Sequence, residues 1–114
     1  MFKIPSSFHI FGQEIRVEYS SILIDEIDCV GLSKLRRNTI VLQKGNGIEM
    51  YRPQSQVEQT FFHELMHWAF HLLGEEELEK DEKLVDKIGQ VLHQAFTTFE
   101  YRDEEKKVGR PQEF

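Results

Sequence analysis

Two histidines and a glutamate are the residues of this chain whose types and spacing could most directly do chemistry. They stand in the run His63-Glu64-Leu65-Met66-His67. On a helix, residues four apart lie on one face, so the two imidazoles could share one Zn²⁺. The glutamate beside the first histidine could then take a proton from a water on the metal. The run therefore predicts a hydrolytic metal site with His63 and His67 as ligands and Glu64 as the general base.

The segment around this run predicts a buried helix with one polar stripe. Residues 56–73 contain no Pro, Gly, Lys or Arg. At about 100° per residue, His63, His67 and His71 fall within one wedge, and most of the remaining circumference is apolar. The alternative interpretation is a solvated face, which usually carries Lys, Arg, Asp or Ser. A stripe of three histidines and a glutamate suits a metal better.

The ends of this helix also have sequence signals. Ser55 and Glu58 match a capping box at its start, and Gly74 directly follows its last apolar residue. An acidic connector over residues 75–79 then leads to a second predicted helix.

A third protein ligand is expected from this second helix, predicted over residues 81–101, because catalytic zinc sites usually have three protein ligands. Glu82 and Asp86 are four residues apart and border its apolar arc. Glu82 could bind the metal, while Asp86 could accept the free ring N–H of His63 and fix its tautomer. Gly89 would let two helix backbones approach closely. The alternative role for Glu82 is to offset the helix dipole.

His71 is the alternative third ligand. It lies about 12 Å from His63 along a straight helix, and no Gly interrupts the helix before it, so the two cannot easily reach one ion. It could instead donate to an oxyanion at the cleft edge. His93 lies about 16 Å along the second helix from Glu82, too far to share the ion. Nothing in the sequence places His9 near the site.

The run His63-Glu64-x-x-His67 followed by Glu82-x-x-x-Asp86 resembles the gluzincin arrangement of metallopeptidases. The resemblance implies a zinc-dependent endopeptidase with one Zn²⁺ per chain. It also implies Glu64 as the base and His63, His67 and Glu82 as the ligands.

More narrowly, residues 29–96, including the strand-like run 38–42, are similar to short zincin-like proteins of bacteriophages and mobile elements. These include ImmA/IrrE-type metallopeptidases and SprT-like proteins. The chain departs from them in two respects, because it carries neither a recognisable helix-turn-helix segment nor an extra cysteine cluster. Both departures leave the substrate open.

The composition limits the classes of protein to which this chain could belong. A chain of 114 residues with a net charge of −6 and one cysteine fits a single domain without an intrachain disulfide. The acidic balance argues against nucleic acid as the main ligand. The N-terminus has no apolar signal region and no run could span a membrane. Cys29 suits a reducing compartment, so we expect the cytoplasm, that of a bacterial host if the chain is phage-encoded.

The remaining sequence predicts two β-hairpins ahead of the helices, with strands over residues 8–11, 15–19, 30–35 and 39–43. Residues 20–28 fit either a strand or a helical turn. We therefore expect an α+β fold: a small antiparallel sheet of three or four strands packed with two helices, a minimal zincin-like domain. The domain should cover residues 1–101, with a charged tail over residues 102–114.

A protein or peptide substrate could add to an exposed edge of this sheet through backbone hydrogen bonds. Arg36 and Arg37 either bind an acidic group of the substrate or are solvated turn residues. Tyr51, His71 and Tyr101 are candidate donors to the oxyanion.

Two other classes of protein remain open. One is a catalytically silent zincin-like protein with structural zinc that acts by binding a partner; the intact Glu64 and the lack of a fourth ligand argue against it. The other is a metal-free interaction protein. The oligomeric state does not follow from the sequence.

Overall fold

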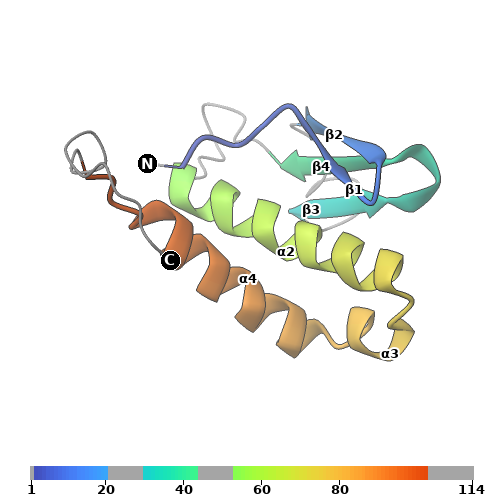
Figure 1. The fold of residues 1–114 in the computed structure, drawn as a ribbon. Helices are drawn as coiled ribbons and strands as arrows, with labels where there is room; N and C mark the ends of the chain where they lie inside the picture. Colours follow the sequence, from blue (N-terminus) through green and yellow to red (C-terminus); the bar gives the residue numbers. More distant parts are fainter. Residues whose placement is uncertain (1, 21–29, 44–52, 103–114) are drawn as a thin grey trace, which may run out of the picture.

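The structure is a computed structural model that describes residues 2–20, 30–43 and 53–102 (Figure 1). Within these ranges the elements are β1 (Ser7–Ile10), β2 (Gln13–Ser20), β3 (Gly31–Lys34), a 3₁₀ turn (Leu35–Arg37), β4 (Thr39–Gln43), α2 (Gln54–Leu73), α3 (Glu76–Glu79) and α4 (Glu82–Thr97). The predicted α+β class is confirmed. A short third helix, α3, forms within the predicted acidic connector. The segment predicted as strand or helical turn lies, from residue 21 on, outside the described residues.

The strands form one sheet in the order β1-β2-β4-β3. Both predicted hairpins are confirmed, because β1 pairs with β2 and β3 with β4 in antiparallel fashion. However, β2 and β4 are parallel, so the sheet is mixed and the expectation of an antiparallel sheet is wrong. The reason is that β4 returns from β3 and inserts between β3 and β2. All five β4 residues are buried, as expected for a strand with a neighbouring strand on each side.

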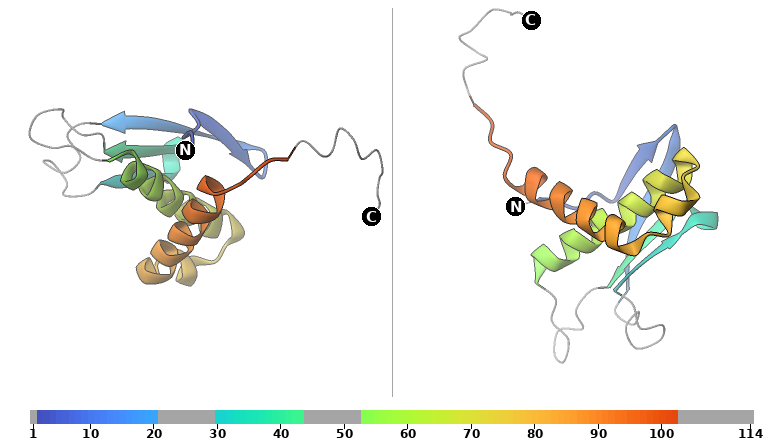
Figure 2. Two further views of the ribbon diagram at one scale, coloured as in Figure 1. Left: turned by 90° about the vertical axis from the view of Figure 1, so that its left-hand side faces the viewer. Right: turned by 90° about the horizontal axis from the view of Figure 1, so that it is seen from below.

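Helix α2 lies between the sheet and α4, so the domain has three layers (Figures 1 and 2). Its apolar side contributes Phe61, Phe62 and Trp68 to the main core, where they meet Ile15 and Ile40 of the sheet. A helix that packs on two sides must be apolar around most of its circumference, as the sequence of α2 is. No helix among the described residues is long and apolar enough to cross a membrane.

The two ends of α2 differ in how well they were predicted. The helix stops at Gly74, whose φ of 76° is a left-handed conformation that favours glycine, as predicted. The predicted capping box is wrong, because Pro53 is the N-cap residue and no side chain caps the helix there. Glu58 is buried instead, and its carboxylate contacts His93 of α4.

Helix α4 packs closely on α2 at Gly89. A Cβ atom at this position would lie 3.1 Å from the backbone nitrogen of His63 and 3.2 Å from its Cα. The predicted close approach of the two backbones at this glycine is therefore confirmed. Helix α4 ends at Thr97, four residues earlier than predicted, and the predicted tail is described only at Arg102.

Candidate metal centre

The polar stripe of α2 faces a cleft between β3 and α4. The cleft has a volume of about 740 Å³. Its lining combines four consecutive residues at β3 with the stripe of α2 and acids from α3 and α4: Val30, Gly31, Leu32, Ser33, Gln56, Gln59, Thr60, His63, Glu64, His67, Glu79, Glu82 and Asp86. None of these lining residues is a Lys or Arg.

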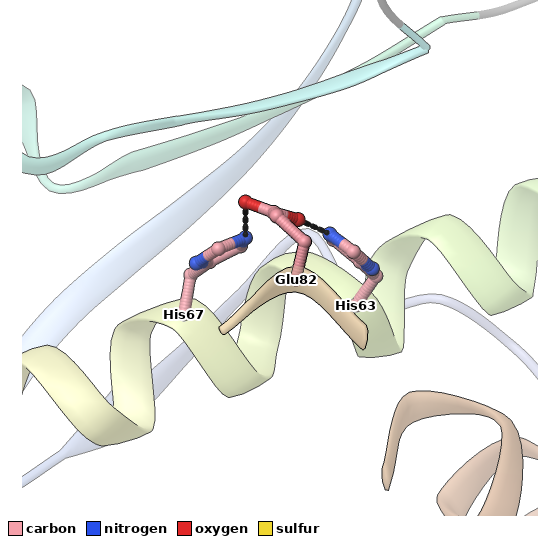
Figure 3. A group of neighbouring side chains, drawn as sticks. All are labelled: His63, His67 and Glu82. Carbon is pink, nitrogen blue, oxygen red and sulfur yellow. Dashed lines mark hydrogen bonds and ion pairs between the residues drawn. The ribbon is translucent and has the colours of Figure 1, made fainter. Parts of the chain in front are cut away.

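Three side chains that the sequence singled out as ligands converge at this cleft (Figure 3). One donor atom each from His63, His67 and Glu82 lies within 4.8 Å of the other two. We call these residues the donor group. The two oxygens of Glu82 lie 3.1 Å from His63 Nε2 and 3.3 Å from His67 Nε2. Two imidazole nitrogens and a carboxylate around one point form a donor set that fits Zn²⁺, which takes three such ligands in catalytic sites.

The other ring nitrogen of each histidine faces a second carboxylate. Asp86 Oδ1 lies 3.4 Å from His63 Nδ1, the partner that the sequence suggested. Glu79 Oε2 lies 2.9 Å from His67 Nδ1, a contact that the sequence did not predict. A carboxylate at Nδ1 accepts the ring N–H and so leaves the Nε2 lone pair free for a metal. With a metal at Nε2, these two carboxylates would keep the ring proton of each imidazole at Nδ1.

Glu64, the expected general base, is buried at the wall of the same cleft with 7% exposure. The Ser33 hydroxyl donates a hydrogen bond of 2.7 Å to its Oε1 atom. Burial raises the pKa of Glu64, while the Ser33 hydrogen bond and the charges of His67 and His63 act in the opposite direction. The carboxylate is thus held in a fixed position, in an environment that makes it a stronger base than an exposed glutamate.

Gly31 explains how β3 comes close enough for this contact. A Cβ atom at Gly31 would lie 2.5 Å from Thr60 Cγ2 and 3.1 Å from Glu64 Oε2. Only a residue without a side chain allows the strand to approach α2 so closely. Neither Gly31 nor Ser33 could be identified from the sequence, because nothing local in the run Cys29 to Lys34 shows that this strand packs beside the motif helix.

The remaining candidates lie away from the donor group. His71 is exposed and contacts Trp68, with 6.0 Å between the ring centroids. Tyr101 is 87% exposed. Neither side chain lines the cleft. Tyr51 lies outside the described residues. His9 is exposed on β1, and His93 contacts Glu58.

Comparisons with known proteins give no match for this chain among family models, curated proteins or solved structures. The resemblance to gluzincins therefore depends on the two sequence motifs, and the function must be argued from the geometry of the cleft.

Proposed function

We propose that this protein is a zinc-dependent endopeptidase that holds one zinc ion through His63, His67 and Glu82. One observation carries the proposal: Glu82 reaches both Nε2 atoms while a separate carboxylate stands against each Nδ1 atom. Three protein ligands leave a coordination position open toward the cleft, as in catalytic zinc sites, whereas structural sites are closed by a fourth. This argues for catalysis rather than for a purely structural metal.

The residues around the donor group have distinct roles in this proposal. Zinc at this position would supply a Lewis acid that polarises the scissile carbonyl and makes water acidic. Glu64 accepts the proton from the attacking water and returns it to the leaving amine. Ser33 holds one oxygen of Glu64, which limits the orientations that the carboxylate can adopt. Asp86 and Glu79 keep the two imidazoles oriented.

The substrate in this proposal is a protein or peptide that lies along β3. This strand is at one edge of the sheet, and residues 30–33 all line the cleft. Consecutive residues can line one cleft only if the backbone edge of the strand faces it, since their side chains alternate between the two faces. Among the described residues β3 has a strand neighbour on one side only, so its other backbone edge could pair with an extended peptide and bring a carbonyl beside the donor group. The acidic chain argues against nucleic acid, and Cys29 suits a reducing compartment such as the bacterial cytoplasm.

Metal content and cleavage test the proposal together. Protein purified without chelator or metal-affinity tag should contain about one zinc per chain by elemental analysis. It should cleave a denatured protein mixture, and o-phenanthroline should stop the cleavage. Glu64→Gln should keep its zinc but lose activity by a factor of about 10²–10⁴, the usual contribution of a general base. The matched control is Glu77→Gln, because Glu77 is an exposed acid of α3 that does not line the cleft.

Each outcome has a separate meaning. Zinc bound with equal cleavage by wild type and Glu64→Gln would remove the peptidase assignment. Zinc bound without cleavage in any variant would support the silent zincin-like protein. No zinc after addition and removal of excess would leave α2 as a core helix only, and the metal-free interaction protein would replace the proposal.

A further inference from the structure

The two faces of edge strand β3 have surroundings of opposite charge. Paired residues in neighbouring strands point to the same face of a sheet, so the register assigns each side chain to a face. Ser33 pairs with Ile40, and its hydroxyl reaches Glu64 on the α2 side. Lys34 pairs with Thr39, which in turn pairs with Arg16 of β2. Lys34, Thr39 and Arg16 therefore form one row on the face away from α2.

On this outer face lies a second pocket of about 220 Å³, which we call the basic pocket. Arg16, Lys34 and Arg37 line it with three positive charges, against one negative charge from Glu18. Arg16 and Thr39 both donate hydrogen bonds to the Arg37 carbonyl, at 3.5 and 2.9 Å, so the row is tied to the turn before β4. Within the described part of the chain, no carboxylate lies within 4.0 Å of these three cations. On a chain with a net charge of −6, a pocket lined by three cations and one carboxylate is a local exception.

The cleft face of β3 has the opposite balance. Four carboxylates line the cleft, those of Glu64, Glu79, Glu82 and Asp86, and no Lys or Arg accompanies them. A divalent ion in the donor group would neutralise only two of these charges, so the cleft would stay negative with both imidazoles neutral. A peptide side chain that points into the cleft should therefore not be acidic. A peptide side chain that points to the outer face should be acidic.

We propose that the basic pocket selects substrates with an acidic residue opposite Lys34, next to a residue without negative charge that faces the donor group. The inference rests on the proposed function, because it takes the peptide to pair with β3. An extended peptide alternates its side chains between the two faces, so adjacent residues would meet the basic pocket and the acidic cleft. Lys34 lies on β3 itself, the strand with which the peptide would pair, whereas Arg16 lies two strands further in. Arg37 and Arg16 add to the positive potential in which the acidic side chain would lie.

Peptide binding tests this selection without any need for cleavage. Zinc-treated Glu64→Gln protein would be titrated into fluorescent octapeptides with one Glu scanned along a neutral, β-forming host sequence, and binding followed by anisotropy. Matched peptides would carry Gln or Lys at the scanned position. At low salt the best Glu peptide should bind about fivefold more tightly than its Gln partner, and the difference should shrink as salt is raised. Moving the Glu by one residue along the peptide should abolish the preference for Glu over Gln.

Charge variants locate the preference on the protein. Lys34→Gln combined with Arg37→Gln should bring Glu and Gln peptides to within about twofold of each other, because the attracting charges are removed. Lys3→Gln is the control, because it removes one exposed positive charge that lines neither pocket. It should keep the full preference.

The outcomes separate this inference from the proposed function. Zinc-dependent cleavage of the peptides without an acid preference would overturn the selection and leave the peptidase assignment standing. The same preference in the Lys34/Arg37 variant, or no binding of any peptide, would also overturn the selection. A preference that is lost in the variant would support the basic pocket, even if the wild-type protein cleaved none of the peptides and the peptidase assignment failed.

Discussion

Helices α2 and α4 meet through two sets of histidine–carboxylate contacts that differ in burial and in number of partners. In the donor group, the Glu82 side chain is 68% exposed and each of its oxygens has its own imidazole nitrogen. At the other contact, His93 Nε2 lies 2.8 Å from Glu58 Oε1, and the two side chains are 12% and 3% exposed. The second oxygen of Glu58 is buried without a hydrogen-bond partner among the described residues.

The difference shows that residue type alone does not make a metal site. The Glu58–His93 contact offers one nitrogen and one carboxylate, fewer than the three protein ligands that a zinc site needs. The donor group offers three donors, a carboxylate behind each imidazole and an open cleft. We therefore propose metal binding for the donor group and a stabilising role for the Glu58–His93 contact. The two regions should respond to mutation in opposite ways.

The largest effect is expected for Glu82→Ala. It removes a proposed metal ligand and should weaken zinc affinity by more than about 100-fold, beyond the effect of losing a residue that only orients a ligand. Because the side chain is exposed, the free energy of unfolding of the metal-free protein should change little. Competition with a chromogenic zinc chelator would measure the affinity. His71→Ala is the control, and a large loss there with none in Glu82→Ala would move the third ligand to His71.

His93→Ala should show the reverse pattern. It leaves the Glu58 carboxylate buried without its hydrogen-bond partner, which should cost about 2 kcal/mol in the free energy of unfolding. Zinc affinity should stay within about twofold of wild type, because the side chain contributes nothing to the donor group. Urea denaturation of the chelator-treated protein would measure the loss. Gln94→Ala, an exposed neighbour on α4, is the control.

The paired change His93→Leu with Glu58→Leu sharpens this test. Replacing both partners of a buried polar pair by apolar residues should recover most of the lost stability. A double variant as unstable as His93→Ala would mean that packing, rather than the unpaired carboxylate, causes the loss.

The sequence predicted the helices and hairpins because their signals are local. Apolar periodicity identified α2 and α4, Gly74 marked the end of α2, and four short strand-like runs predicted both hairpins. The parallel pairing of β2 with β4 could not be predicted, because it depends on where β4 inserts. The capping box failed for a related reason. Glu58 has the right spacing from Ser55, but its partner is 35 residues away on another helix.

The residues of the candidate site also differ in whether the sequence could predict them. His63, His67, Glu82 and Asp86 could be chosen in advance because helical spacing places each pair on one face. Ser33 and Glu79 could not, because each contacts the motif helix from an element whose position depends on tertiary packing.

A smaller effect on the donor group is expected for Glu79→Ala. It removes the acceptor at His67 Nδ1, so the imidazole loses its fixed tautomer and zinc affinity should fall about tenfold. Glu79→Gln should lie between wild type and Glu79→Ala, since the amide oxygen can still accept the ring N–H. The same chelator competition applies, with Glu77→Ala as the control. If the zinc affinity of Glu79→Ala is unchanged, the Glu79–His67 contact does not support metal binding. It would then only stabilise the fold, as the Glu58–His93 contact does.

The smallest effect is expected for Gly31→Ala, which tests how closely β3 must approach α2. The added methyl group would overlap Thr60 Cγ2, so the free energy of unfolding should fall by about 1 kcal/mol. Thr60→Ser removes the overlapping methyl group and should restore part of that loss in the double variant, whereas the single Thr60→Ser change should have little effect on its own. Urea denaturation of the three variants would measure the coupling. Strictly additive losses would mean that β3 shifts as a whole, and Ser33 would then lose its contact with Glu64 as well.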